Sequence, residues 1–180
     1  MSSKGFTLIE LIIVISIIGI LAIALGISFQ GWIGRYKIES EFKEMYVDLM
    51  NAKTRAMSRN RTHFVSLAIT QYSIQEDIDP WPNGDGLLTA NDSVRPAGYN
   101  DRIPFRQKNL DPGYSITWTS ASPIRFDTRG LTPLADTGTI RVSTSSNADY
   151  DCIALTETRI NLGKWEDCDA SNPGNECCER

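Results

Sequence analysis

The sequence predicts an α+β protein in which a long N-terminal α-helix packs on an antiparallel β-sandwich head. Three observations support this prediction. A run of 24 residues, Leu11 to Gly34, contains no charged side chain. From residue 35 to residue 61 the chain is charged, and apolar residues recur every three or four positions. After residue 62 come short segments rich in β-branched and aromatic residues, separated by Gly, Pro, Asn, Asp and Ser.

The uncharged run is long enough to cross a membrane. As an α-helix it extends about 36 Å, against ~30 Å for the hydrocarbon core of a bilayer. Three interpretations fit it: a permanent anchor, a secretory signal peptide that is removed, or a segment cleaved in front of the run and retained. Ala24-Leu25-Gly26 offers a signal-peptidase site for the second interpretation. Glu10 argues against the signal-peptide interpretation. A charge at the centre of a bilayer costs about 2.5–3.5 kcal/mol, so a carboxylate in this apolar segment is expected to have a function that offsets this cost.

The residues around Glu10 form a motif that explains the carboxylate in the apolar segment. Lys4-Gly5-Phe6-Thr7-Leu8-Ile9-Glu10-Leu11 resembles the class III signal of type IV pilins and pseudopilins. The resemblance implies that a prepilin peptidase cleaves between Gly5 and Phe6 and methylates the new amine of Phe6. Glu10 is then the anion nearest to that amine in the apolar segment. In a filament, the resemblance implies that Glu10 pairs with the Phe6 amine of a neighbouring subunit.

The charged segment that follows predicts an amphipathic helix. Its apolar residues form one stripe: Phe42, Met45, Tyr46, Leu49, Ala52 and Ala56. A charged helix of this length is marginal unless its apolar face is covered, so we expect the stripe to face the core of the head. The expected parts of the chain are a leader at 1–5, a transmembrane and filament-core helix at 6–34, an amphipathic helix at 35–62, and a globular β head with a cysteine-bearing tail at 63–180.

The head is expected to consist of short strands in two packed antiparallel sheets. The predicted strands are Phe64–Ile69, Ser115–Thr119, Ile124–Phe126, Gly138–Ser143, Tyr150–Leu155 and Arg159–Leu162. Within this region 51–67, 124–130 and 138–142 resemble segments of the FimT/FimU minor pilins and the H-type, GspH-like pseudopilins of type II secretion. The subfamily is therefore expected to be one of these two.

An acidic loop follows the first predicted strand. Asn83, Asp85 and Asp92 approach the spacing of a calcium-binding loop, but Trp81 occupies the first ligand position and Asp92 the last. Hard cations take oxygen ligands of this kind, so these three residues are calcium candidates. The alternative is a solvated turn, which the incomplete motif favours.

The four cysteines, Cys152, Cys168, Cys177 and Cys178, lie in the last 29 residues. If Lys4 keeps the N-terminus in the cytoplasm, they reach an oxidising compartment. Adjacent Cys177 and Cys178 do not suit a bond with each other, so we expect each to pair with Cys152 or Cys168, in an order left open. Zinc is a weak alternative, because the C-x₂-C spacing is missing.

The resemblance implies a structural subunit, a minor pilin or pseudopilin of a type IV pilus or of a type II secretion pseudopilus. Its implied partners are other pilins or pseudopilins in a filament or tip complex, prepilin peptidase and the inner-membrane assembly platform. Its implied location is the bacterial inner membrane, with a single pass and the head outside the cytoplasm, and then a periplasmic pseudopilus or an extracellular pilus.

Catalysis and nucleic-acid binding are both disfavoured. The chain has one histidine, His63, and lacks Walker A, Gly-x-Ser-x-Gly and His-Glu-x-x-His motifs, so neither catalytic residues nor a cofactor are expected. The rival function is DNA uptake by a basic C-terminal region, but residues 163–180 carry five acidic and two basic side chains. Arg102, Arg106 and Lys108 form the one separate basic cluster that could contact phosphate.

Overall fold

The computed structural model describes residues 5–82, 84–111, 113–119, 123–143, 147–167 and 175–179. For residues 24–32, 167, 175, 176 and 179 it describes the backbone only. Asn83 and Cys168, both candidates from the sequence, lie outside the described residues. The chain divides into two compact units, residues 1–37 and 38–180.

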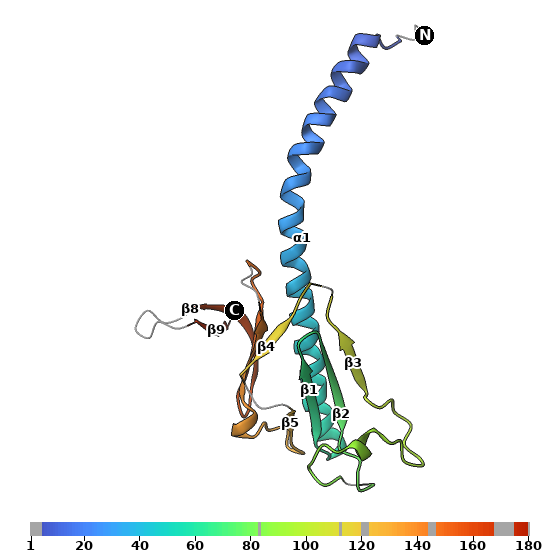
Figure 1. Cartoon of the computed structure of the whole chain (residues 1–180), viewed down its shortest axis with the longest axis vertical. Helices are drawn as coiled ribbons and strands as arrows, with labels where there is room; N and C mark the ends of the chain where they lie inside the picture. Colours follow the sequence, from blue (N-terminus) through green and yellow to red (C-terminus); the bar gives the residue numbers. More distant parts are fainter. Residues whose placement is uncertain are drawn as a thin grey trace. The chain divides into compact units, whose positions relative to one another are not determined.

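Helix α1 runs from Leu8 to Arg59, a length of 52 residues (Figure 1). In the first unit the described large apolar side chains of the helix are exposed, between 46% for Val14 and 76% for Leu8. Within the part of the chain whose side chains are described, no helix meets both the length and the hydropathy needed to cross a membrane.

In the second unit, one face of α1 is buried in the head. Of the predicted stripe, Phe42, Met45, Leu49, Ala52 and Ala56 are between 0% and 3% exposed, and the sequence prediction for this face is confirmed. Tyr46 is half-buried against the same core. The helix ends at Arg59, and Asn60 takes a positive φ of 54° before the chain enters the first strand.

Sheet A has four antiparallel strands in the order β3-β2-β1-β5. They are β1 (His63–Ala68), β2 (Gln71–Glu76), β3 (Arg106–Asn109) and β5 (Ile124–Phe126). Val65 pairs with Ile74 and Leu67 pairs with Tyr72, so these four buried side chains share the face turned to the core.

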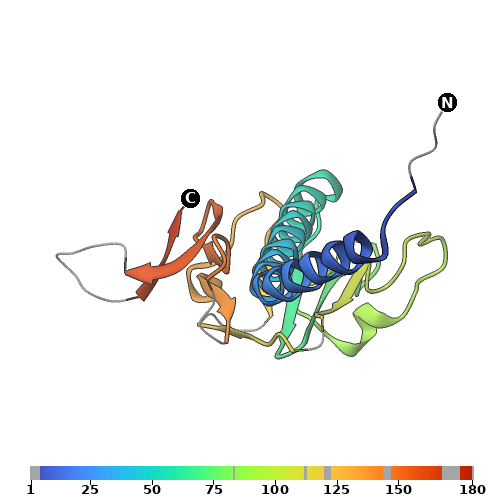
Figure 2. The same cartoon turned by 90° about the horizontal axis from the view of Figure 1, so that it is seen from above.

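Sheet B has five antiparallel strands in the order β4-β6-β7-β8-β9. They are β4 (Ile116–Trp118), β6 (Gly138–Val142), β7 (Cys152–Leu155), β8 (Ile160–Asp167) and β9 (Asn175–Glu179). Two short 3₁₀ turns, η1 (Ala90–Ser93) and η2 (Leu134–Asp136), lie in the connections. In Figure 2, seen from above, the red β8–β9 pair and the green loop after β2 extend to opposite sides of the head.

The buried side chains of α1 and of both sheets form one apolar cluster. The α+β fold class, with a helix packed on antiparallel sheets, is therefore confirmed. The sequence prediction missed three strands, β2, β3 and β9, and ended the β8 prediction at Leu162, although β8 continues to Asp167.

Candidate functional site

The N-terminal segment places the predicted cleavage site just before α1. Gly5, Phe6 and Thr7 are not helical, and the helix begins at Leu8. The hydroxyl oxygen of Thr7 accepts the backbone N–H of Glu10 at 3.3 Å, which satisfies one of the free amides at the helix start. The Gly5–Phe6 peptide bond therefore lies outside the hydrogen-bonded helix.

Among the residues that the structure describes, no neighbour requires a glycine at position 5. A Cβ atom built on Gly5 meets no other atom within 4 Å.

Glu10 sits in the first turn of α1, where a negative charge suits the positive end of the helix dipole. The apolar side chains around it are exposed, with Phe6 at 87%, Ile9 at 67% and Leu11 at 61%. Among the described residues, no cation lies within ion-pair distance of Glu10. An apolar surface of this size with one carboxylate matches a helix that is covered by other helices or by lipid.

His63, the single histidine, is fully buried at the start of β1. Its Nδ1 lies 3.1 Å from the carbonyl oxygen of Arg61, and its ring meets the ring of Phe105 edge-on at 5.6 Å. Burial lowers the pKa of His63 to about 4. The imidazole is therefore neutral at pH 7 and packs as a core side chain.

The acidic loop is organised by carboxylates that accept backbone amides. The Asp92 side chain is fully buried and accepts the N–H groups of Ile78, Asp79 and Thr89 at 2.7–3.0 Å. The Asp77 side chain likewise accepts the N–H groups of two residues, Asp85 at 3.2 Å and Gly86 at 2.6 Å.

These contacts bear on the calcium candidates. Among the described residues, no three His, Cys, Asp or Glu side chains are grouped so as to hold a metal ion. Asp92 uses its oxygens on amides, and Asp85 Oδ1 accepts the N–H of Leu87 at 2.9 Å. A Cβ at Gly84, where φ is +74°, would overlap the Asp77 carboxyl, so the loop needs glycine there. Gly84, Asp77, Asp85 and Asp92 thus each have a structural role in this loop.

Two residues of the separate basic cluster pair with acidic side chains of α1. Arg106 pairs with Glu44 and, at 2.6 Å, with Asp48. Lys108 pairs with Glu44 and, at 2.8 Å, with Glu41. These pairs attach β3 to the helix and neutralise two of the three cations proposed for phosphate contact. The third, Arg102, is exposed.

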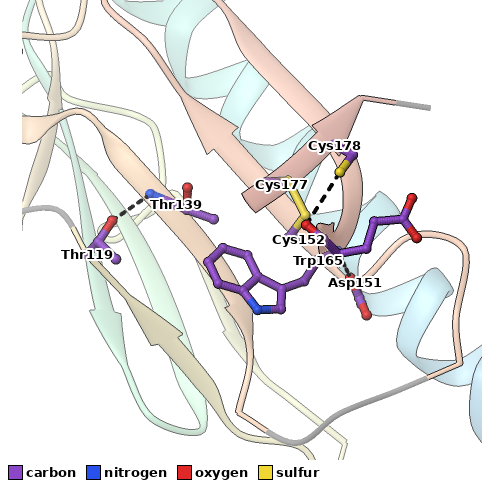
Figure 3. The surroundings of a disulfide bond; sticks show 8 residues. Thr119, Thr139, Asp151, Cys152, Trp165, Cys177 and Cys178 are labelled. Carbon is purple, nitrogen blue, oxygen red and sulfur yellow. Dashed lines mark hydrogen bonds between the residues drawn. A yellow bond between two sulfur atoms is a disulfide. The ribbon is translucent and has the colours of Figure 1, made fainter. Parts of the chain in front are cut away.

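The cysteine-bearing tail is fastened by a disulfide between Cys152 of β7 and Cys177 of β9. The sequence left this pairing open. The two strands are not neighbours, because β8 lies between them. Figure 3 shows the bond beside the Trp165 ring, with Cys178 nearby. Cys178 is also disulfide-bonded, and none of the described cysteines is free.

Gly163 of β8 lies beneath this bond. It pairs with Cys152 on one side and with Glu179 on the other. A Cβ at this position would lie 3.2 Å from the Cys177 sulfur and would overlap the Cys178 carbonyl oxygen. Glycine therefore allows the disulfide to cross over β8. Sequence reasoning missed this role, since a glycine inside a strand signals only that some backbone or side chain approaches closely.

Solved structures of a minor pseudopilin and of a minor pilin resemble this chain in fold. Two structures of the minor pseudopilin EpsH from the type II secretion system of Vibrio cholerae resemble the chain with TM-scores of 0.50 each and identities of 8% and 9%. They cover 71% and 79% of this chain and 95% and 98% of theirs. The type IV minor pilin FimU of Pseudomonas aeruginosa resembles it with a TM-score of 0.51 and 15% identity, over 74% of this chain and 92% of that one.

Comparison with curated proteins gives no significant match. Residues 1–26 match the prokaryotic N-terminal methylation motif. Together, this motif, the exposed apolar helix and the helix-packed β head define a protein of the minor pilin and pseudopilin class. Residues 42–158 match the family described as type II transport protein GspH. The chain belongs to the GspH family.

Proposed function

We propose that the chain is a prepilin that is cut between Gly5 and Phe6, N-methylated at Phe6 and built into a filament through α1. The match of residues 1–26 to the methylation motif is the observation that carries this proposal. The geometry supports it, because the scissile bond precedes the helix and position 5 has no structural need for glycine.

The proposed assembly is either a type II secretion pseudopilus or a type IV pilus. The first is the system of EpsH, and the second is that of FimU. In either one, the first half of α1 anchors the chain in the inner membrane, with the head outside the cytoplasm, and later packs among the helices of other subunits. Gly19 and Gly34 have open space around them, which permits a close approach of neighbouring helices.

Within the filament, Glu10 pairs with the Phe6 amine of an adjacent subunit. The carboxylate has no ion-pair partner among the described residues and lies on a surface that assembly would cover. An uncompensated charge there opposes burial, and an incoming cationic amine removes that cost. The role is structural, and the proposal includes no reaction on the head.

Intact-mass analysis of the purified protein tests the processing step. The expected mature chain begins at N-methyl-Phe6. Gly5→Val should leave uncut precursor in the membrane, and Gly19→Val serves as the matched control because both glycines lie in open space. A mature N-terminus at Ile27 would establish an ordinary signal peptide and refute the proposal.

Incorporation tests the pairing step. Glu10→Gln keeps the shape of the side chain but removes its charge, so we expect loss of the protein from sheared filaments while the head stays folded. Glu39→Gln, in the second unit, is the control and should be incorporated normally. Normal incorporation of Glu10→Gln would refute the pairing.

DNA binding has less support than the structural role. The cations of β3 are paired with three acidic side chains of α1. Titration of a DNA duplex at low and moderate salt tests this alternative, since binding through phosphates weakens steeply as salt rises.

A further inference from the structure

A hollow of about 300 Å³ opens at the C-terminal end of α1. We call it the Arg–Trp hollow, and it is lined by Arg59, Arg61, Trp81, Gly98, Tyr99, Asn100 and Asp101. Neither the methylation motif nor α1's apolar half accounts for it. We propose that the Arg–Trp hollow docks a carboxylate-bearing segment of a partner subunit. The proposal rests on the proposed function, because the partner belongs to the same assembly.

The hollow has a rigid, charged floor. The Glu76 carboxylate is 3% exposed and accepts hydrogen bonds from Arg59 at 3.1 Å, Arg61 at 2.9 Å and the Tyr99 hydroxyl at 2.7 Å. Burial opposes the ionisation of Glu76, but the bonds from Tyr99 and Arg61 outweigh it and keep the pKa below its ordinary value. Both guanidinium groups are therefore held in place before any partner arrives, which lowers the entropic cost of binding.

The wall of the hollow is aromatic. The Arg61 guanidinium stacks over the Trp81 ring at 4.6 Å from its centroid, and the Trp81 and Tyr99 rings meet edge-on at 5.8 Å. Trp81 remains 43% exposed, although it is one of the largest apolar side chains of the head. Arginine, tryptophan and tyrosine are the residue types that carry most binding energy in protein interfaces.

The local charge is positive, although the chain as a whole carries −4. The network contains three arginines and two acids: Arg55, Arg59, Arg61, Glu76 and Asp101. Arg95 adds a fourth guanidinium, which donates from Nε to the Tyr99 carbonyl oxygen at 2.6 Å. The lining of the hollow itself contains two cations, Arg59 and Arg61, and one anion, Asp101, which is an excess of one positive charge above the Glu76 floor.

This arrangement favours a carboxylate over a nucleic-acid backbone. A planar carboxylate fits the fork of a guanidinium, and a single acidic side chain with an apolar neighbour fills a space of this size beside Trp81. A nucleic acid presents a continuous row of phosphates, which needs a longer run of cations than the two arginines that line this hollow. An excess of one positive charge in the lining suits one acidic residue of a protein segment.

Photo-crosslinking of the full chain in its own cells tests the proposal. The probe is p-benzoylphenylalanine at Ala97, an exposed residue next to Gly98. Asn100 lines the hollow, is exposed and lies outside the Glu76 network, so Asn100→Asp and Asn100→Lys change the charge in opposite directions. Asn109→Asp and Asn109→Lys, at an exposed position of β3 away from the hollow, are the matched controls.

We expect cross-links to a protein peptide with Asp or Glu within about two residues of the linked position. The cross-link yield should fall about threefold with Asn100→Asp and rise about threefold with Asn100→Lys, the size of one surface charge interaction. The Asn109 variants should leave it unchanged. Cross-links only to nucleic acid or lipid, an absence of protein adducts, or equal effects of the two Asn100 variants would overturn the proposal.

The same cells separate this inference from the proposed function. If the chain carries N-methyl-Phe6 and is found in purified assemblies, but gives no cross-link directed to acidic residues, the docking proposal alone fails. If it is absent from the assemblies, the proposed function fails, and the partner-subunit docking fails with it.

Discussion

The disulfide between Cys152 and Cys177 should provide a large part of the stability of the head. The bonded residues are 25 positions apart. The chain-entropy relation assigns about 3.5 kcal/mol at room temperature to closing a loop of this length. The tail it holds is polar, so few apolar contacts can replace the bond. We therefore expect Cys152→Ala with Cys177→Ala to lower the melting temperature by about 10 °C, at about 3 °C per kcal/mol for a head of this size.

The assay is thermal unfolding of the exported full chain in detergent, followed by circular dichroism. Peptide mapping without reduction should recover the Cys152–Cys177 pair, and because Cys178 is also bonded, thiol titration of the wild type should find at most one free thiol. Replacing both cysteines avoids leaving a lone reactive thiol. A melting temperature that falls by less than about 3 °C, or a map that joins Cys152 to another cysteine, would refute the reasoning.

Three further predictions concern single side chains. Gly163→Ala should lower the free energy of unfolding by about 2 kcal/mol or more, because its Cβ would overlap the Cys178 carbonyl. Denaturant unfolding measures this change, and an unchanged stability would contradict the claim that the disulfide needs glycine where it crosses β8. Lys108→Met should lower the free energy of unfolding by about 2 kcal/mol, because Glu41 loses its cation. Wild-type stability in the same assay would show that this ion pair does not attach β3 to α1. Burial raises the pKa of Asp77 to about 6 from 3.8, so the folded chain holds this proton more tightly and gains stability as the pH falls through 6 towards 4. The stability of Asp77→Asn relative to wild type should therefore decrease by about 2 kcal/mol between about pH 7 and pH 4, and a difference independent of pH would contradict the shift.

The sequence revealed the parts of the fold that depend on local pattern. The stripe from Phe42 to Ala56 has helical spacing, and its members lie in or against the core. β2 was missed although Tyr72 and Ile74 alternate with polar residues, because two apolar positions in a polar segment are a weak strand signal. β3 has no apolar residue at all, and its attachment depends on acidic side chains of α1 that precede it by about 60 positions.

The candidate sites also differ in whether a local sequence pattern reveals them. Gly5, Phe6 and Glu10 lie within six consecutive residues, so the order of residues along the chain is enough to display their motif. The Arg–Trp hollow has no such local signature, because it joins the end of α1 to Trp81 and Tyr99, which lie in a loop with no regular pattern. The acidic loop has contacts that sequence spacing does not reveal, since Asp92 accepts three backbone amides from residues up to 14 positions away.

The disulfide over Gly163 also determines how the head responds to mechanical force. Tension applied to β9 would otherwise act directly on the hydrogen bonds that join it to β8. The covalent link instead passes the load to β7, whose Ile153 and Leu155 lie in the core. A pull on the tail is therefore resisted by the packing of the whole head, and β9 can be stripped away only if a covalent bond breaks or β7 leaves the core with it.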